Sequence, residues 1–507
     1  MHGFGREHIS YNTNVNLIPN SKKDLILAPQ IPTMKKLTLL ISFVLLLGCS
    51  DVDNPVIADA KNYGKPAPAD IESELFDLKK VPSITLTFTL SEWNKLLTNY
   101  DLNPKNEKKV VSNFTYTAPG KTVQLNNIGL KLKGNTSRRR PEGDTGQLHD
   151  GFNPDWHHCH FALDFSKNID NQRFKGLNKL NLKWCKDDAT YVREVYSYDL
   201  FRRFGCWTSP KASFCKLTIM VEGDAQPAYY GVYVMLESVD EDYIIKRSAQ
   251  WGSAIGWLWK GGYGSSGHNA NFVQTVSMGI EDVNLSPALS QYFAYDLKTR
   301  KDEEVAAKVA LTQFITDLNT KTGAEFRSWI AQKIDVPLFL KTYATNVIVG
   351  MWDDYWVNGN NFYFYLAPNG KFYFIPYDYD NTLGTSFLIS NSGTRNPLAW
   401  GSMTDRPLIT KILAIPEYQA LYKGYITNLV FVGNEYFAAS KSMMRIQGWQ
   451  AKIAPFISND TGEDMNILDH PASWANQPNY RLLSGNNQGG VSGPGNFFLS
   501  RTSSIPW

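Results

Sequence analysis

The chain has 507 residues, with 51 Lys plus Arg against 48 Asp plus Glu, and 43% of its residues are hydrophobic. This length allows one large domain with an appendage, or two or three domains, and the hydrophobic content is ample for a core. A formal net charge of only +3 gives no support to nucleic-acid binding. Aromatic residues make up 13%, which fits an exported protein or a stacking site and fits an aromatic core equally well.

An export signal begins inside the chain. Met34, Lys35 and Lys36 supply a charged start, an apolar run follows from Leu37 to Leu47, and Cys49 comes after a glycine. The run is too short to span a bilayer, so we interpret it as the apolar part of a signal peptide and not as a transmembrane helix.

The small residue before Cys49 resembles a bacterial lipoprotein signal, which predicts lipidation of this cysteine. Residues 1–49 are assigned to an upstream extension plus this signal, with a secretory signal without lipidation as the alternative. Residues 50–75, rich in Pro and Ala after an acidic start, are predicted to be a tether. We expect an exported protein, held by its lipid in the outer membrane or at the cell surface of a Gram-negative bacterium and touching the membrane only there.

The four remaining cysteines lack the spacing of a zinc site. In an oxidising compartment they can form two disulfides, and buried free thiols explain them equally well. They are Cys159, Cys185, Cys206 and Cys215.

Short alternating segments from about Ile84 to Leu132 predict a β-rich region, with one helix over 90–99 for which Thr89 and Ser91 are candidate caps. The last strand leads into the turn KGNTSR, whose small residues and basic side chains suit contact with phosphate. A solvated basic turn is the alternative. The candidate phosphate-binding residues of this turn are Lys133, Asn135 and Ser137.

The clearest helix is predicted to begin at 188–191, because the apolar residues from Val192 to Phe204 fall on one face, and Gly205 supplies a left-handed stop. Glu194 lies in its first turns, where the helix dipole favours an acid whatever its function. Strands are expected around this helix, and from Glu303 onward the chain is mainly helical up to a hairpin. The expected strands cover 160–165, 179–183, 214–222, 229–237 and 256–260.

The most informative stretch runs from Met351 to Ser386. Aromatic runs at 362–366 and 372–375 flank a Pro-Asn-Gly turn, which is typical of a β-hairpin with one buried aromatic face.

A hairpin brings its two flanks to the same end, so Asp354 and Asn361 should lie beside Asp378 and Asp380. Only oxygen ligands gather there, which favours Mg²⁺ or Mn²⁺ over zinc. Asp and Asn are also common in turns and caps, so any one of these acids has a non-functional explanation.

The segments GNNFYFY, GKFYFIPYDYDNTLG and KGNTSR resemble the CotH (spore coat protein H) kinase family, an atypical protein-kinase-like group. The resemblance runs from about residue 80 to about residue 430. It implies an α+β, two-lobed kinase-like fold with a β-rich N-terminal lobe and a mainly helical C-terminal lobe. The predicted parts are an N-terminal β-rich segment over 76–130, a CotH kinase-like domain over 131–445 and an irregular C-terminal tail over 446–507.

The resemblance also implies roles for single residues. Asp354 takes the catalytic position, with Asp353 able to exchange roles with it. Asp378 takes the metal-binding position, supported by Asn361 and Asp380. The positions implied to face the nucleotide are Lys133, Asn135, Ser137, Glu194, Lys260 and Phe372, with Glu194 pairing the phosphate-binding lysine.

Three positions depart from the family pattern. Lys133 replaces an arginine, which retains the charge and loses the bidentate fork. Phe372 replaces an adenine-stacking aromatic residue that is more usually Trp. His160 stands where the family often carries a lysine, whose role is then lost or passes to Lys179, Lys183 or Lys260.

The implied function is binding of ATP and Mg²⁺, or Mn²⁺, with transfer of phosphate to a hydroxyl of an exported protein acceptor. One alternative is a catalytically inactive nucleotide-binding or adhesin-like surface protein. Another is a lipoprotein that binds or processes glycans, with the pair Asp353 and Asp354 as acid and base. Their adjacency argues against the last, because the acids of glycosidases usually come from separate strand ends.

Overall fold

The computed structural model describes residues 74–457, except 187, 189, 386–387 and 390, and residues 497–507. The predicted signal, with Cys49, and almost all of the predicted tether lie outside these ranges and stay predictions. Among the helices that are described, none has both the length and the apolar content needed to cross a bilayer.

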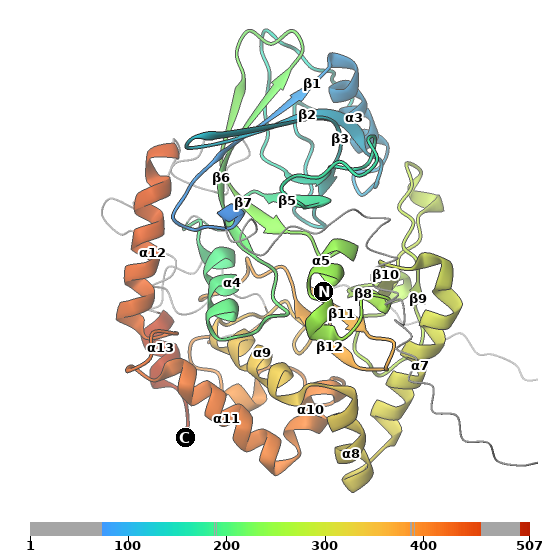
Figure 1. Ribbon diagram of the computed structural model, residues 1–507, viewed down its shortest axis with the longest axis vertical. Coiled ribbons are helices and arrows are strands. Elements are labelled where there is room, and N and C mark those ends of the chain that lie inside the picture. The colour runs from blue at the N-terminus through green and yellow to red at the C-terminus, as the bar shows by residue number, and fades with distance from the viewer. Residues whose placement is uncertain (1–73, 187, 189, 386–387, 390, 458–496) are drawn as a thin grey trace, which may run out of the picture. The chain divides into compact units, whose positions relative to one another are not determined.

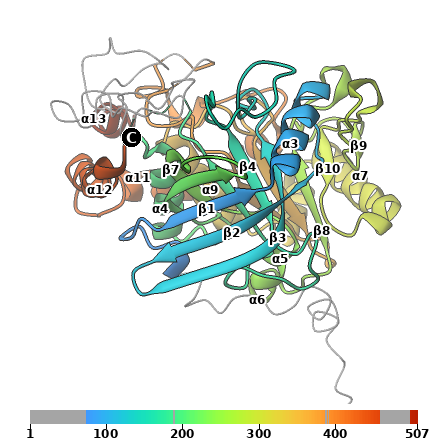
Figure 2. The same cartoon turned by 90° about the horizontal axis from the view of Figure 1, so that it is seen from above.

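Seven strands close into a barrel in the order β1-β2-β3-β4-β5-β7-β6 (Figures 1 and 2). All neighbouring strands are antiparallel except β1 and β6, whose parallel pairing closes the barrel. Alternate residues of β1 are buried, as the two-residue period of a strand requires. The strands are β1 Ser83–Phe88, β2 Val110–Ala118, β3 Lys121–Lys133, β4 His160–Asp164, β5 Lys179–Lys183, β6 Ala212–Val221 and β7 Ala228–Glu237.

A second sheet has the order β12-β11-β8-β10-β9. Its strands β11 (Phe362–Leu366) and β12 (Phe372–Pro376) form the predicted hairpin, which is confirmed. Both of its faces are buried, where the sequence predicted one. Phe372 and Phe374 pack toward helices α7 (Glu304–Thr320) and α9 (Val336–Ile348), and Tyr365 and Tyr373 contact Trp251. The other strands are β8 Trp257–Gly261, β9 Met278–Gly279 and β10 Tyr295–Leu297.

Helices separate the strands of these sheets and follow the last of them. Helix α3 (Leu90–Leu102) begins as predicted at Thr89, whose hydroxyl accepts the backbone N–H of Glu92 at 3.2 Å. The others are α4 Arg193–Arg203, α5 Glu241–Lys246, α6 Ser248–Trp251, α7 Glu304–Thr320, α8 Gly323–Lys333, α9 Val336–Ile348, α10 Pro407–Leu413, α11 Pro416–Val430, α12 Ala439–Ile453 and α13 Phe497–Ser503.

The start of helix α4 corrects the prediction that it begins at 188–191. Tyr191 has a φ of 62°, in the left-handed region that a right-handed helix excludes. The carboxylate of Asp188 instead accepts the backbone N–H of Arg193 at 3.0 Å, so the helix begins there. Its predicted stop is confirmed, because Gly205 has a φ of 79°.

The α+β class is confirmed, but two predicted boundaries fall inside secondary-structure elements. Residues 130 and 131 both lie in β3, which pairs with β2 and β4 in one barrel. Residues 445 and 446 both lie in α12, and α13 in the predicted irregular tail buries Phe497 and Phe498 in the core. The four cysteines are buried thiols that form no disulfide with one another, which selects the thiol alternative.

Candidate functional site

Lys183, the last residue of β5, joins three parts of the chain. Its ammonium group donates to Oε1 of Glu194 at 2.7 Å, to Oδ1 of Asp378 at 2.5 Å and to Oδ2 of Asp380 at 3.3 Å. The barrel supplies the lysine, the first turn of α4 supplies Glu194, and the segment after β12 supplies the two aspartates. We call these four residues the Lys183 cluster.

Burial and charge in the Lys183 cluster set its protonation. Burial disfavours the ammonium of Lys183, yet the charges of Asp378, Asp380 and Glu194 outweigh it and hold its pKa well above the ordinary value. Burial likewise opposes the ionised form of Asp378, but Lys183 and Lys133 outweigh it and hold the pKa of this carboxyl below its usual range. Asp378 and Lys183 are therefore a charged pair at neutral pH.

The KGNTSR turn borders the cluster. The ammonium of Lys133 lies 5.1 Å from the centre of the Tyr377 ring and interacts with the charges of Asp378 and Asp380. Gly134 has a φ of 109°, and a Cβ there would lie 2.6 Å from Oγ of Ser137, so the turn requires glycine. Asn135 in the same turn is exposed.

His160 does not replace the family's lysine. It is 2% exposed, and its Nδ1 accepts the backbone N–H of Trp184 at 2.9 Å. Burial, together with Lys183 and Lys133, holds its pKa well below the ordinary value, so the ring is neutral at pH 7. Of the three lysines expected to take over, Lys183 is the one that meets Glu194.

The hairpin register brings the expected residues to one end. Phe362 pairs with Pro376, so Asn361 and Asp378 lie just beyond the last paired residues. Both have a left-handed backbone, with φ of 53° and 65°, which Asn and Asp adopt more readily than most residues. The backbone N–H of Asp378 donates to the hydroxyl of Tyr198 at 2.9 Å.

The adjacent acids Asp353 and Asp354 have different surroundings. Asp353 is half-buried and accepts Nδ2 of Asn358 at 2.6 Å and Nδ2 of Asn361 at 2.8 Å. Asp353 lies on the side of the Lys183 cluster, because its donor Asn361 adjoins the last hairpin pair, Phe362 and Pro376. Burial raises the pKa of Asp353, and the charge of Asp378 adds to this rise.

Asp354 is enclosed and 2% exposed. Its carboxylate accepts Nδ2 of Asn346 at 2.7 Å and the backbone N–H of Val357 at 2.9 Å, and burial raises its pKa to about 6. These contacts hold the Asp354 carboxylate inside the loop. Of the two acids expected at the catalytic position, Asp353 is therefore the more accessible to a ligand.

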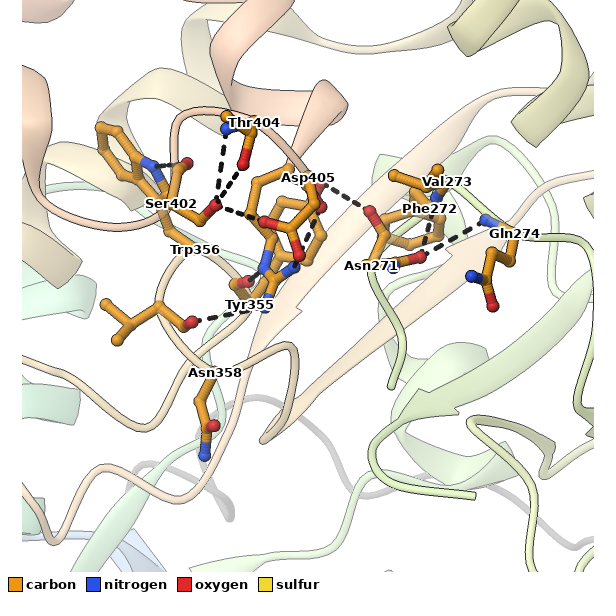
Figure 3. A network of polar contacts seen from close by, with 12 residues as sticks. Asn271, Phe272, Val273, Gln274, Tyr355, Trp356, Asn358, Ser402, Thr404 and Asp405 are labelled. Atoms are coloured by element: carbon orange, nitrogen blue, oxygen red, sulfur yellow. Dashed lines mark hydrogen bonds and ion pairs between the residues drawn. The ribbon is translucent and has the colours of Figure 1, made fainter. Parts of the chain in front are cut away.

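The loop that carries both acids is tied to the segment before α10 (Figure 3). Buried Arg406 donates through Nε to the carbonyl of Tyr355 at 2.6 Å and through Nη2 to the carbonyl of Val357 at 3.3 Å. Nε1 of Trp356 donates to the carbonyl of Ser402 at 3.0 Å, and the hydroxyl of Tyr355 donates to the carbonyl of Asn271 at 3.2 Å. The position of the loop is therefore set by segments distant in sequence.

Two residues implied to face the nucleotide do not join the cluster. Phe372 is fully buried, with its ring 5.1 Å from Phe364 and 4.9 Å from Phe314 in stacked arrangements, so this conformation offers no ring face to adenine. Lys260 lies in β8, with Asp296 and Tyr363 as its strand partners, and no contact joins it to Lys183 in the part of the chain that the structure describes.

Sequence reasoning missed three supporting residues. Tyr198 follows Glu194 by one helical turn on α4, a spacing that could have pointed to it. Asn346, which links Asp354 to the Tyr379 hydroxyl, and Arg406 carry no local signal, because their partners lie on other elements.

The donor set suits a hard cation bound together with phosphate. Within the described ranges, no group of three or more His, Cys, Asp or Glu side chains is arranged to hold a metal ion by itself. Mg²⁺ commonly takes only one or two carboxylates and completes its shell with water and substrate phosphates. Asp378, Asp380 and the amide oxygen of Asn361 fit that pattern.

The sequence of this chain is similar to that of a known protein family over the range that contains the site. A family model described as CotH kinase protein matches residues 149–482, which include every residue of the Lys183 cluster and both acids of the loop. The KGNTSR turn precedes the matched range.

Individual relatives are more distant. The chain is 26% identical over 288 residues to inner spore coat protein H of Bacillus subtilis (strain 168), covering 57% of this chain and 71% of that protein. It is 21% identical over 457 residues to invasin CotH7 of Rhizopus delemar, covering 87% of this chain and 66% of that protein. For spore coat protein homolog 1 of Rhizopus delemar the identity is 22% over 386 residues, covering 73% and 54%. Since the family model matches more than half of its length, the chain belongs to the CotH kinase protein family.

Proposed function

We propose that this chain binds Mg²⁺-ATP, or Mn²⁺-ATP, at the Lys183 cluster and transfers phosphate to a hydroxyl of an exported protein. The observation that supports this most directly is the ion pair of Lys183 and Glu194 beside Asp378. Kinases place a strand lysine, a helix glutamate and a metal-binding aspartate in this relation around nucleotide phosphates. In this proposal the barrel is the N-terminal lobe of a kinase-like fold, and the second sheet with its helices is the C-terminal lobe.

Each residue of the site has a role in this proposal. Lys183 contacts the phosphates and Glu194 holds its ammonium in place, while Lys133 adds a second positive charge beside them. Asp378 is the principal metal ligand, with Asp380 and Asn361 in support. Bound Mg²⁺-ATP supplies the transferable phosphoryl group and the cation that neutralises its developing charge.

Asn135 and Ser137 are proposed to approach the phosphates through the KGNTSR turn, on which both lie. Gly134 gives this turn the backbone conformation that brings its small residues together. Backbone N–H groups in such a turn are suitable donors to anions.

Asp353 is proposed to orient the acceptor hydroxyl and to accept its proton. The amides of Asn358 and Asn361 hold the carboxylate at 2.6 and 2.8 Å, so little reorganisation is needed when the acceptor binds. Burial raises the pKa of Asp353, which makes it a better proton acceptor than an exposed aspartate. Asp354 positions the loop from inside.

The proposal extends to location. The relatives are named as spore coat proteins and invasins, which supports a protein that acts outside the cytoplasm. Lipidation of Cys49 would hold the chain at the outer membrane or cell surface, facing an exported acceptor.

One observation favours a second candidate, a binding protein without transfer activity. The side chain of Lys183 is 3% exposed and its ammonium already contacts three carboxylates, so phosphate must displace at least one of them. The glycan-processing alternative loses support, because Asp354 is enclosed and cannot act with Asp353 on one sugar.

The test combines nucleotide binding with transfer. Mg²⁺-ATP at 100 times its Kd should stabilise the chain by about 2.7 kcal/mol in a thermal unfolding assay. Asp378→Asn should reduce this stabilisation, whereas Asp317→Asn on the outer helix α7 should leave it unchanged. Transfer of label from the γ-phosphate, lost in Asp353→Asn with ATP binding retained, identifies the enzyme. Binding without transfer identifies the inactive nucleotide-binding candidate. Absence of any nucleotide effect refutes the kinase and the inactive nucleotide-binding candidate.

A further inference from the structure

A groove of about 540 Å³ lies away from the Lys183 cluster, where three segments meet. Helix α12 forms one wall, the C-terminal half of α4 with Asp199 and Arg202 forms another, and the turn at 76–79 forms the third. Helices α12 and α4 lie next to each other in both views (Figures 1 and 2), and Arg445 of α12 approaches Asp199 of α4 at 3.6 Å. This volume falls in the range of sites that bind ligands.

The groove follows one continuous stripe of α12. The stripe has the spacing of a single helix face, since its members recur at three- and four-residue steps. At a rise of 1.5 Å per residue the stripe is about 16 Å long, which matches about five residues of extended polypeptide. Its members are Lys441, Met444, Arg445, Gly448, Trp449 and Lys452.

Gly448 is in the interior of α12 and leaves a gap in that stripe. A Cβ at this position would have no atom within 4 Å, so neither close packing nor a special backbone conformation explains the glycine. Glycine in a helix interior is less favourable than alanine. The missing side chain opens the groove beside Trp449, and Met444 on the same stripe is 66% exposed.

Five basic and three acidic side chains line the groove, which leaves an excess of positive charge. Glu435 pairs with Lys441 at 2.9 Å and Asp77 pairs with Lys80 at 3.6 Å, so both of these acids are neutralised. Asp199 at its base already accepts Nε of Arg203 at 2.7 Å and faces Arg202 and Arg445, so this acid is neutralised. Lys452 on the rim makes no ion pair with any other described residue. An apolar gap bordered by cations complements a ligand that carries an apolar side chain between carboxylates.

We propose that this groove binds an acidic polypeptide segment, extended along α12, that inserts one apolar or aromatic side chain into the gap at Gly448. The length of the stripe favours a polypeptide over a compact anion, which would need only a few of these cations. This binding does not depend on phosphate transfer.

The test uses the full chain and a fluorescein-labelled peptide with one phenylalanine flanked by glutamates. Anisotropy should report binding that weakens with added salt, and that is lost when lysines replace the glutamates or alanine replaces the phenylalanine. Gly448→Leu, which fills the gap with a good helix former, should weaken binding by about tenfold or more. Gly424→Leu is the matched control, because Gly424 is also interior to an exposed helix face with open space around it, but lies outside the groove. Lys452→Glu should also weaken binding.

Four outcomes would overturn the proposal. The acidic peptide could bind no better than its lysine counterpart, or Gly448→Leu and Gly424→Leu could bind it equally well. Inorganic phosphate could displace the peptide at the same phosphate concentration at which phosphate alone binds the chain, which would make the groove a simple anion site. The chain could self-associate in a manner abolished by Gly448→Leu, measured by light scattering, which would make the groove an interface between copies.

Discussion

Replacing Lys183 by methionine removes the one ammonium group that contacts Glu194, Asp378 and Asp380, while it keeps a side chain of similar length. Removing one partner of a buried ion pair costs about 3–5 kcal/mol, because the remaining charge is left uncompensated. The side chains of Asp378 and Asp380 are 32% and 28% exposed, so water relieves part of this cost. We expect a loss of about 3 kcal/mol in the free energy of unfolding at pH 7.

The dependence on pH has a definite sign. In the natural chain Lys183 holds the pKa of Asp378 below its usual range, so this pair stabilises the fold above the unfolded pKa near 4. That contribution is lost as pH falls through the lower folded pKa. In Lys183→Met, burial and mutual repulsion raise the pKa of the three carboxyls, so the variant recovers stability as they protonate. The loss at pH 7 should shrink by about half at pH 5.

Urea unfolding followed by tryptophan fluorescence measures both quantities. Lys179→Met on the same strand is the control, because the Lys179 side chain is 36% exposed and its ammonium lies 3.8 Å from Asp240. This substitution should cost about 1 kcal/mol or less. Millimolar Mg²⁺ should stabilise Lys183→Met more than the natural chain, since the cation replaces the lost positive charge. A loss below about 1 kcal/mol at pH 7, or one that is equal at pH 5 and pH 7, would refute the reasoning.

Three further perturbations test other parts of the structure. Gly448→Ala and Gly424→Ala should each raise the free energy of unfolding by about 0.5–1 kcal/mol, because an added Cβ meets no atom within 4 Å at either position. Arg406→Met should cost about 2 kcal/mol or more, because it removes a buried donor from the carbonyls of Tyr355 and Val357 in the 351–361 loop, and hydrogen exchange in that loop should accelerate. His160 should stay neutral in the folded chain between pH 7 and pH 5.5, whereas in the unfolded chain it protonates with a pKa near 6.5. The free energy of unfolding should therefore decrease as the pH falls below about 6.5, by up to about 1.4 kcal/mol per pH unit.

Each of these has a result that would contradict it. Destabilisation by either alanine would mean that α11 or α12 packs against something at that glycine. Unchanged exchange in the 351–361 loop of Arg406→Met would remove the anchoring role of the guanidinium. A His160 ring that titrates near pH 6.5 in NMR spectra, or a His160→Gln variant with the same pH dependence of unfolding as the natural chain, would contradict its buried neutral state.

Features that depend on neighbours in sequence could be predicted well. The alternating aromatic runs and the Pro-Asn-Gly turn predicted the hairpin, and its register then placed Asn361 near Asp378 because paired strands end together. The cap at Thr89 and the stop at Gly205 were also predicted, since each involves contacts within one helical turn.

The start of helix α4 was harder to predict. Its apolar spacing extends back to the 188–191 segment, but the left-handed backbone of Tyr191 interrupts it. The carboxylate of Asp188 then accepts the backbone N–H groups of Thr190, before the helix, and of Arg193, its first residue. Helical periodicity describes which residues share a face, and it does not determine at which of them the helix begins.

The sequence by itself determined the family resemblance, the α+β class and the gathering of acids at one end of the hairpin. Only the tertiary structure decided which lysine meets Glu194, because Lys183 and Asp378 come together across 195 positions of the chain. It also decided that Asp353 faces the cluster while Asp354 points inward, and that Phe372 lies in the core. Adjacent residues carry the same local signal, and their directions differ here because long-range partners such as Arg406 fix the backbone of the loop that follows them.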